Sequence, residues 1–245
     1  MMLYDRHTKE GWGGYSFDKA LFPIPAAVMK PLRQRGVLTS GNLHDLDGVR
    51  PNEDQYEEFC QAIGVNPSLN QTIAFAIANM TYALALEDFV LKPLEDQSFG
   101  DFWWIDWQQG GKQGGCPGGK ANPTILLNKL RATDKIRRGQ SQRGMVLARW
   151  GGLGNHRYQV GFSGDVKEVT WANLAYQPYF SMTASNVLFG QWSHDIVGTP
   201  DDLELYTRWV QWGAVSSVMR SHDRGMASGT CSQNNPPDCG IIKVV

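Results

Sequence analysis

The chain has 245 residues, of which 42% are hydrophobic and 19% are charged, so it can bury a sizeable globular core. Its 23 basic and 24 acidic residues leave a net charge of −1, which gives no indication of a nucleic-acid or anionic-membrane partner. No apolar run is long enough to span a bilayer, and the first residues lack a signal-peptide core, so the sequence assigns no compartment.

Hydrophobic periodicity and capping residues predict that helices and strands alternate through the first half of the chain. The expected order is a helix over residues 25–35, a strand over 37–44, helices over 53–63 and 68–94, a strand over 101–106 and a helix over 122–138. The last helix has Asn122 as its N-cap and Pro123 in its first turn, which is typical of a helix start.

The alternation continues through the second half. The expected elements are strands over 145–150 and 158–164, a helix over 169–189, a strand over 191–196, a helix over 201–214 and a strand over 215–221. Pro178 should kink or split the helix over 169–189, because proline lacks the N–H group that a helix interior needs.

Strands that alternate with helices imply a parallel sheet, either doubly wound or closed as a barrel. The barrel is favoured because its catalytic side chains project from the C-terminal ends of its strands, and each candidate strand here ends on or beside a polar residue. Those residues are His44, Asp45, Asp106, Arg149, Asp165, Asp195, His222 and Asp223. The chain also lacks a GxGxxG or GxxxxGK[ST] nucleotide-binding motif. We therefore expect an α/β fold, a partial (β/α)8 TIM barrel with about six of its strands.

Residues 1–245 are expected to form a single, truncated catalytic barrel domain. The chain opens without an apolar element and stops on CGIIKVV, which resembles the start of a strand. The surplus Met1 also suggests an assigned start, so we expect a piece of a longer protein. Cys231 and Cys239 bracket a turn-rich loop and could form a local disulfide, or both could be free thiols.

Three aspartates follow apolar or aromatic runs and carry the main chemical hypothesis: Asp106, Asp165 and Asp195. Two carboxylates that face each other across a site can hydrolyse a glycosidic bond, one as nucleophile and the other as proton donor. A retaining enzyme needs them about 5–5.5 Å apart, which two strands of one barrel can supply. Each aspartate alone is more often a turn or N-cap residue, so the signal is their coincidence on one face.

Aromatic and basic residues surround these aspartates in the sequence. Phe162 and Trp192 come three residues before Asp165 and Asp195, and aromatic walls both raise the pKa of an acid and stack on sugar rings. Arg149 could fork to sugar hydroxyls or to a carboxylate, and His222 could donate to another hydroxyl. Taken alone, Arg149 is more typical of a salt-bridge partner. Trp103, Trp104 and Trp107 alone are more typical of an apolar core.

Several segments resemble motifs of glycoside hydrolase family 31. WWIDWQQG is similar to the nucleophile motif W-x-D-M-N-E, with Trp104 and Asp106 on its W and D. ARWGGLGNHRYQVGFSGDV resembles the segment from the family's arginine to the W-x-G-D of its acid/base, and Arg149 and Asp165 have the family's spacing. The upstream stretch over 11–37 is similar to the segment in which an aromatic-Asp pair and Phe-Pro precede a helix.

Two further motifs follow in the family's order. SHDIVG resembles G-A-D-I-G-G and places Asp195 on a substrate-binding aspartate, and MRSHDRG resembles the R-N-H element and places His222 on its histidine. The resemblance implies a retaining α-glycosidase with Asp106 as nucleophile and Asp165 as general acid/base. It implies a carbohydrate substrate and neither a metal nor an organic cofactor. The residues expected to bind the sugar are Arg149, Asp195, His222, Trp104, Trp107, Phe162 and Trp192.

The sequence also departs from the family's pattern. Trp107-Gln108-Gln109 replaces Met-Asn-Glu after the nucleophile, Thr199 stands where many members have an aromatic residue, and Phe162 replaces a tryptophan. These changes leave the sugar open, and neither the oligomeric state nor the choice among hydrolysis, transglycosylation and α-glucan lyase chemistry is indicated. Two alternatives remain: a non-catalytic carbohydrate-binding product, and a metal-dependent hydrolase whose ligands would be His44, His194, Asp195, His222 and Asp223.

Overall fold

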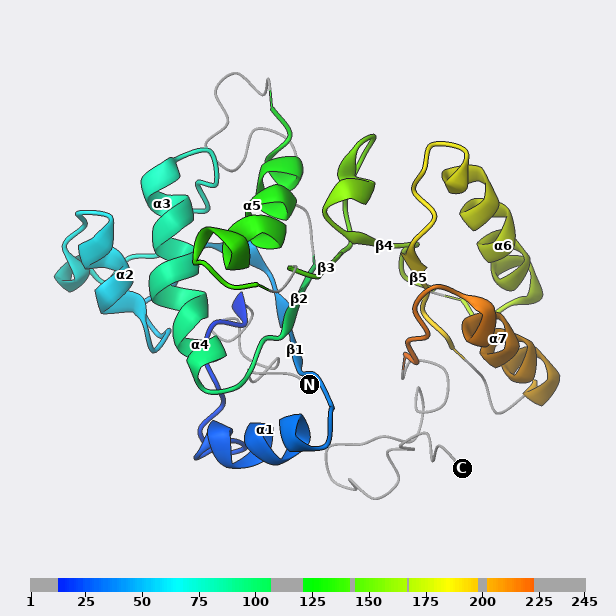
Figure 1. Cartoon of the computed structure of the whole chain (residues 1–245), viewed down its shortest axis with the longest axis horizontal. Coiled ribbons are helices and arrows are strands. Elements are labelled where there is room, and N and C mark those ends of the chain that lie inside the picture. Colours follow the sequence, from blue (N-terminus) through cyan, green and yellow to red (C-terminus); the bar gives the residue numbers. More distant parts are fainter. Residues whose placement is uncertain (1–12, 107–120, 142–143, 167, 198–201, 223–245) are drawn as a thin grey trace. The chain divides into compact units, whose positions relative to one another are not determined.

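A computed structural model of the chain describes residues 13–106, 121–141, 144–166, 168–197 and 202–222. It divides into two compact units, Met1–Gln159 and Val160–Val245, and each combines helices with parallel strands (Figure 1). Among the described residues, no helix has the length and apolar character needed to cross a membrane.

The first unit is built on three parallel strands. They are β1 (Ser40–Leu43), β2 (Phe102–Ile105) and β3 (Val146–Ala148). The pairing register aligns Leu43 with Ile105, and Ile105 with Ala148. All three of these side chains are buried, because they lie in the apolar core of this unit. The residue that follows each strand therefore falls in one row at the C-terminal edge of the sheet.

Helices gather to one side of these strands (Figure 1). They are α2 (Tyr56–Ala62), α3 (Met80–Ala85), the π-helical segment η4 (Leu86–Leu91), α4 (Lys92–Asp96) and α5 (Pro123–Arg137), while α1 (Pro25–Gln34) and the 3₁₀ turns η2 (Asp45–Asp47), η3 (Pro67–Leu69) and η6 (Asn155–Arg157) complete the unit. The predicted helix start at Asn122 is confirmed, since its side chain accepts a hydrogen bond from the Thr124 N–H at 2.9 Å.

The helix predicted over 68–94 is wrong in its first part. Asn70 has a positive φ of 49°, and Ile73 forms an antiparallel bridge with Val49, so this stretch is drawn into extended structure. The helix begins only at Met80, where the side chain of Asn79 accepts hydrogen bonds from two backbone N–H groups. Side-chain capping and a long-range backbone pairing thus outweigh the local helical pattern.

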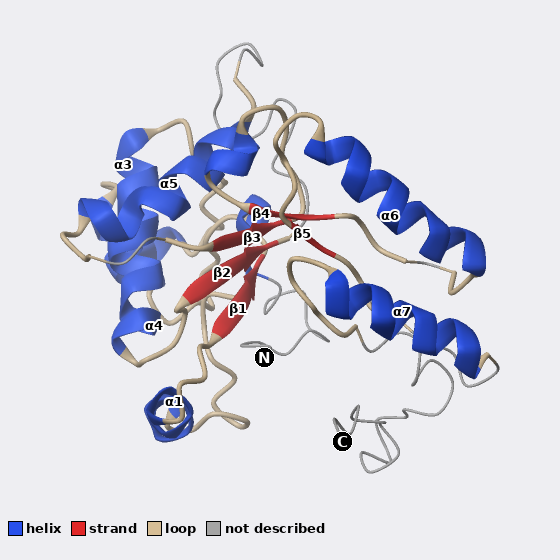
Figure 2. Cartoon of the chain, turned by 45° about the vertical axis from the view of Figure 1, so that its right-hand side comes forward, coloured by secondary structure: helices blue, strands red, loops and turns tan. Residues whose placement is uncertain are grey.

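The second unit contains β4 (Val160–Phe162) and β5 (Trp192–Ser193), which pair in parallel. Helices α6 (Trp171–Ser185) and α7 (Leu203–Val215) lie side by side in this unit (Figure 2). The strand predicted over 215–221 is present only as two isolated parallel bridges, from Ser193 to Val218 and from Ile196 to Ser221. These bridges still extend the sheet beyond β5.

The predicted break at Pro178 does not divide α6, which runs through this proline from Trp171 to Ser185. A proline inside a helix removes one backbone hydrogen bond. The rest of the helix outweighs that loss, and its N-cap Thr170 accepts a hydrogen bond from the Asn173 N–H at 3.2 Å. The described residues therefore carry parallel strands separated by helices, which is the α/β pattern expected for part of a TIM barrel.

Candidate active site

Three polar residues follow β1, β2 and β3 and meet at the C-terminal edge of the first unit: His44, Asp106 and Arg149. The backbone register places them side by side, because the Asp106 N–H donates to the Leu43 carbonyl at 2.9 Å and the Arg149 N–H donates to the Ile105 carbonyl at 3.0 Å. The Arg149 Nε donates to Asp106 Oδ1, and His44 Nε2 lies 3.7 Å from Asp106 Oδ2.

The Asp106 carboxylate is thus in contact with a permanent cation. Its side chain is 13% exposed and that of Arg149 is 16% exposed, so water screens this pair only in part. A guanidinium in contact favours the ionised carboxylate, which is the form that can act as a nucleophile. The sequence allowed Arg149 to bind sugar hydroxyls or a carboxylate, and in this structure it contacts the carboxylate of the candidate nucleophile.

A buried network of charged residues begins at Asp45, the residue that follows His44. Asp45 is fully buried, and it accepts hydrogen bonds from the Tyr15 hydroxyl at 2.8 Å and from Arg131 at 3.0 Å. The same arginine donates to Glu87 of η4 at 2.7 Å. Burial raises the pKa of Glu87 from 4.5 to about 7, while Arg131 opposes this rise. The network ties the end of β1 to η4 and α5, and it holds His44 beside the candidate nucleophile.

In the second unit, Asp195 follows β5 and is fully buried. Arg220 donates from its terminal nitrogen to Asp195 Oδ1 and from Nε to the Ser193 hydroxyl at 3.0 Å. The guanidinium carbon also lies 4.9 Å from the centre of the Phe162 ring, which is within the range of a cation–π contact. Arg220 therefore fixes the orientation of the carboxylate that the sequence places among the sugar-binding residues.

Asp165 is exposed and lies three residues after β4. Its neighbours on both sides are anchored: the Ser163 N–H donates to the Ser193 carbonyl at 3.1 Å, and Val166 is buried with Ile196. Between them, Gly164 has a φ of 108°, which L-residues rarely adopt. The backbone at Gly164 thus takes a conformation that favours glycine, and the next residue, Asp165, is exposed at the surface of this unit.

The remaining predicted site residues differ in exposure, and some of them lie outside the described residues. His222 is partly exposed, and its N–H donates to the Ile196 carbonyl at 2.9 Å. Trp104 on β2 is also partly exposed. Trp107 lies outside the described residues, as do Thr199 and three of the four cysteines; the described cysteine, Cys60, is a buried free thiol.

Two of the predicted aromatic walls lie inside the second unit. Trp192 is 9% exposed and packs against Phe180 and Phe189, with ring centres 4.7 and 4.4 Å apart. Phe162 is also buried, beneath Arg220. These rings support the residues above them, and direct contact with a sugar stays a prediction.

No role in sugar chemistry was predicted for Arg220 or His194. The only available signal was their place beside the candidate residues His222 and Asp195 at strand ends. For the metal-dependent alternative, within the ranges that the structure describes no three His, Cys, Asp or Glu side chains are grouped so that they could hold an ion. His194 instead bonds to Ser163, Gln177 and Ser181.

Comparison with known proteins identifies the domain. Residues 1–235 match the family model "Glycosyl hydrolases family 31 TIM-barrel domain". No curated protein matches the chain. Solved structures with similar folds include a sulfoquinovosidase from E. rectale in complex with an aza-sugar inhibitor, at TM-score 0.69 and 17% identity over 97% of this chain and 40% of that one.

Two other similar structures have different specificities in their names. One is a Flavobacterium johnsoniae dextranase with isomaltotriose, at TM-score 0.66 and 19% identity over 95% of this chain and 32% of that chain. The other is an α-xylosidase from a soil metagenome with xylose, at TM-score 0.64 and 19% identity over 87% and 35%. The chain thus spans well under half the length of these enzymes, and the likeness shows a shared fold. Since the family model covers nearly all of its length, the chain belongs to glycosyl hydrolase family 31 and carries part of that family's TIM-barrel domain.

Proposed function

We propose that this domain is a retaining α-glycosidase that hydrolyses O-glycosidic bonds of α-linked glycosides. Asp106 is the nucleophile and Asp165 is the general acid/base in this proposal. The observation that carries it is the contact of Arg149 with Asp106 at the C-terminal end of β2, within a chain of family 31. In a barrel, catalytic groups project from this end of the strands.

In the first step, an Asp106 oxygen attacks the anomeric carbon while the bond from that carbon to the leaving oxygen breaks. Asp165 gives its proton to the leaving oxygen, so the alcohol departs neutral. The result is an ester between Asp106 and the sugar. Because the carboxylate loses its charge in this step, its attraction to Arg149 weakens, and the guanidinium becomes available to the sugar hydroxyls.

In the second step, Asp165 takes a proton from water, and the water oxygen attacks the anomeric carbon. The ester bond to Asp106 breaks, which restores the carboxylate and releases the sugar with net retention. Asp195, held by Arg220, and His222 bind hydroxyls of the sugar in this proposal. Arg149, Trp104 and Trp107 are further residues that contact the sugar in this proposal.

Trapping the ester tests the nucleophile directly. The 245-residue chain is incubated with 5-fluoro-α-glycosyl fluorides of several sugars, in which the ring fluorine slows both steps and the fluoride leaves without protonation. We expect one of them to add a single glycosyl mass to the peptide that contains Asp106. Asp106→Asn should abolish the label, whereas Asp165→Asn should still form it, because this leaving group needs no acid.

Circular dichroism and a cooperative thermal transition provide the folding control for each variant. A folded chain that binds the sugars but never acquires the label would show a non-catalytic carbohydrate-binding domain instead. Label on another carboxylate would overturn the assignment of Asp106. Product analysis with unlabelled α-glycosides separates hydrolysis from transglycosylation and from lyase chemistry, and the sugar that labels best indicates the specificity.

A further inference from the structure

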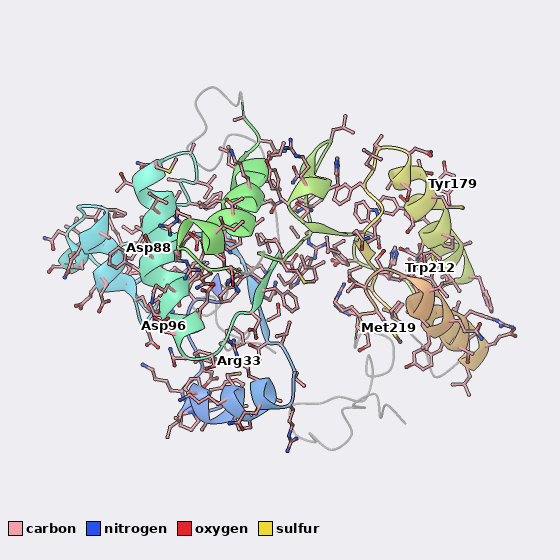
Figure 3. The ribbon with its side chains drawn as sticks, in the orientation of Figure 1. Arg33, Asp88, Asp96, Tyr179, Trp212 and Met219 are labelled. Carbon is pink, nitrogen blue, oxygen red and sulfur yellow. The ribbon has the colours of Figure 1, made fainter. Side chains whose placement is uncertain are left out.

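A buried imidazole lies directly before Asp195 and behind the loop that carries Asp165. His194 is 1% exposed, and its ring is surrounded by β4, β5, α6 and α7. Trp212 of α7 is labelled in Figure 3. The centre of its ring lies 5.4 Å from the centre of the imidazole. A buried histidine with this many polar neighbours is an ordered part of the structure, and the glycosidase mechanism above gives it no role.

The hydrogen bonds of His194 fix its tautomer. Its Nδ1 lies 2.8 Å from the Ser163 hydroxyl and 2.9 Å from Gln177 Oε1. The Gln177 amide is oriented by its own Nε2, which donates to the Asn173 carbonyl at 3.1 Å. Since Oε1 can only accept, Nδ1 must carry the hydrogen, and Nε2 is left to accept from the Ser181 hydroxyl at 3.3 Å.

The imidazole is neutral in this arrangement. Burial, helped by the nearby Arg220 cation, lowers the pKa of His194 from 6.5 to about 4. Neutral imidazole supplies one donor and one acceptor, which is what Gln177 and Ser181 require. The charged groups next to it in this unit are Arg220 and Asp195, and these two are paired with each other.

Ser163 connects this ring to the candidate acid/base. Its hydroxyl donates to Gln177 Oε1 at 2.8 Å, and its N–H donates to the Ser193 carbonyl. Asp165 is only two residues further on, past the positive-φ Gly164. A shift of Ser163 would therefore be transmitted to the Asp165 carboxylate, whereas the other side of the loop is held by buried Val166.

We infer that His194 is a positioning residue for the acid/base: through Nδ1–H it locks Ser163 and Gln177 together and so sets where the Asp165 carboxylate stands. This inference rests on the proposed function, in which Asp165 protonates the leaving group. General acid catalysis contributes about 10²–10⁴-fold, and a small misplacement of a catalytic group can cost about 10²-fold. Loss of the imidazole should therefore impair the proton transfer and spare steps that need none.

The test compares two substrates of the sugar that labels Asp106: its α-glycosyl fluoride and its methyl α-glycoside. We compare kcat/KM, which reports formation of the ester alone, because Asp165 also acts as a base when the ester is hydrolysed. His194→Leu, an apolar residue of similar size, should lower kcat/KM on the methyl glycoside by about 10²-fold and change kcat/KM on the fluoride by less than about threefold. His194→Asn can keep a donor at the Nδ1 position, so it should recover the methyl glycoside rate to within about tenfold. Ser185→Ala is the control, because Ser185 lies on α6 one turn after Ser181, the residue that bonds to His194. This variant should change neither rate.

Asp165→Asn is run in parallel so that the two proposals fail separately. If Asp165→Asn shows no dependence on the leaving group, the acid/base assignment is wrong. If it shows that dependence and His194→Leu lowers both rates equally, the histidine is merely structural and this inference is overturned. If His194→Leu does not fold, Ser163→Ala is used instead, because it removes the hydroxyl between the imidazole and the loop that carries Asp165. Its rates on the methyl glycoside and on the fluoride are then compared in the same way.

Discussion

Asp106 and Asp165 each follow an apolar strand, yet their surroundings differ in the structure. The first is largely buried, with Arg149 in contact and His44 at 3.7 Å, and the second is exposed on a loop whose neighbours are anchored. A carboxylate held by a cation suits a nucleophile, which must stay ionised. A carboxylate near water suits a group that exchanges protons in both steps. The difference agrees with the roles proposed for the two.

Glu53 provides a prediction about pH. It is 5% exposed and accepts a hydrogen bond from Ser16 at 2.5 Å, and burial raises its pKa from 4.5 to about 7. The folded state therefore holds this proton more tightly than the unfolded state does. The stabilisation of the folded state by this bound proton is complete below pH 4.5. It is lost as the pH rises to 7 and above.

Glu53→Gln removes this ionisation and can keep the acceptor for Ser16. Relative to the parent chain, its free energy of unfolding should rise between pH 5 and pH 8, by about 2 kcal/mol. Urea unfolding at the two pH values measures the difference. Glu58→Gln, an exposed change on α2, should leave it unaltered. A difference that is the same at both pH values would contradict the prediction.

The elements of the first unit are joined by charges as well as by apolar packing. Residues 80–96 form one helix in three segments, α3, η4 and α4, and its π-helical segment carries Glu87 toward Arg131 of α5. π-helical insertions often occur at functional sites. Here the insertion serves the ion network that also binds Asp45, directly after His44.

Arg131→Met tests the weight of this network. Asp45 and Glu87 are 0% and 1% exposed, so the variant would leave two buried carboxyl groups without their cation. We expect the free energy of unfolding to fall by about 3–5 kcal/mol in urea or guanidinium titrations. Arg208→Met removes an exposed pair with Glu204 and should cost less than about 1 kcal/mol. Equal losses for both variants would show that burial of the network is not what matters.

At the scale of the whole chain, the proposed chemistry needs two carboxylates and no metal. The two ring nitrogens of His194, one of the candidate ligands of the metal-dependent alternative, already bond to hydroxyl and amide groups. We therefore expect hydrolysis of an aryl α-glycoside to continue at an unchanged rate after dialysis against EDTA. A loss of activity that returns with an added divalent cation would revive the metal-dependent alternative.

Substrate choice is also a property of the whole domain. The three similar enzymes share this fold at 17–19% identity, yet they are named for sulfoquinovose, dextran and xylose substrates. The shared fold alone therefore does not decide which sugar is bound. The break from the family's motif at Trp107-Gln108-Gln109 lies directly after the candidate nucleophile, and it is the first place to look for this chain's specificity.

Much of the fold was readable from local signals. The N-cap at Asn122, the apolar strands and the polar residue after each strand predicted an α/β barrel domain, and the ordered motifs indicated family 31, as the comparisons confirm. Such signals work because caps and periodicity depend on neighbouring residues. The wrong predictions lie where pairing with a distant residue outweighs the local pattern, as at the backbone bridge between Val49 and Ile73.

Contacts between distant residues could not be read in this way. The strand register brings Arg149 onto Asp106, three-dimensional packing places Trp192 in the core, and Arg220 meets Asp195 across 25 positions of sequence. Each depends on how separate strands and helices align, which no local pattern encodes. The sequence therefore indicated which residues carry the chemistry, while their partners follow from the folded chain, because hydrogen bonds and charges act through space and not along the sequence.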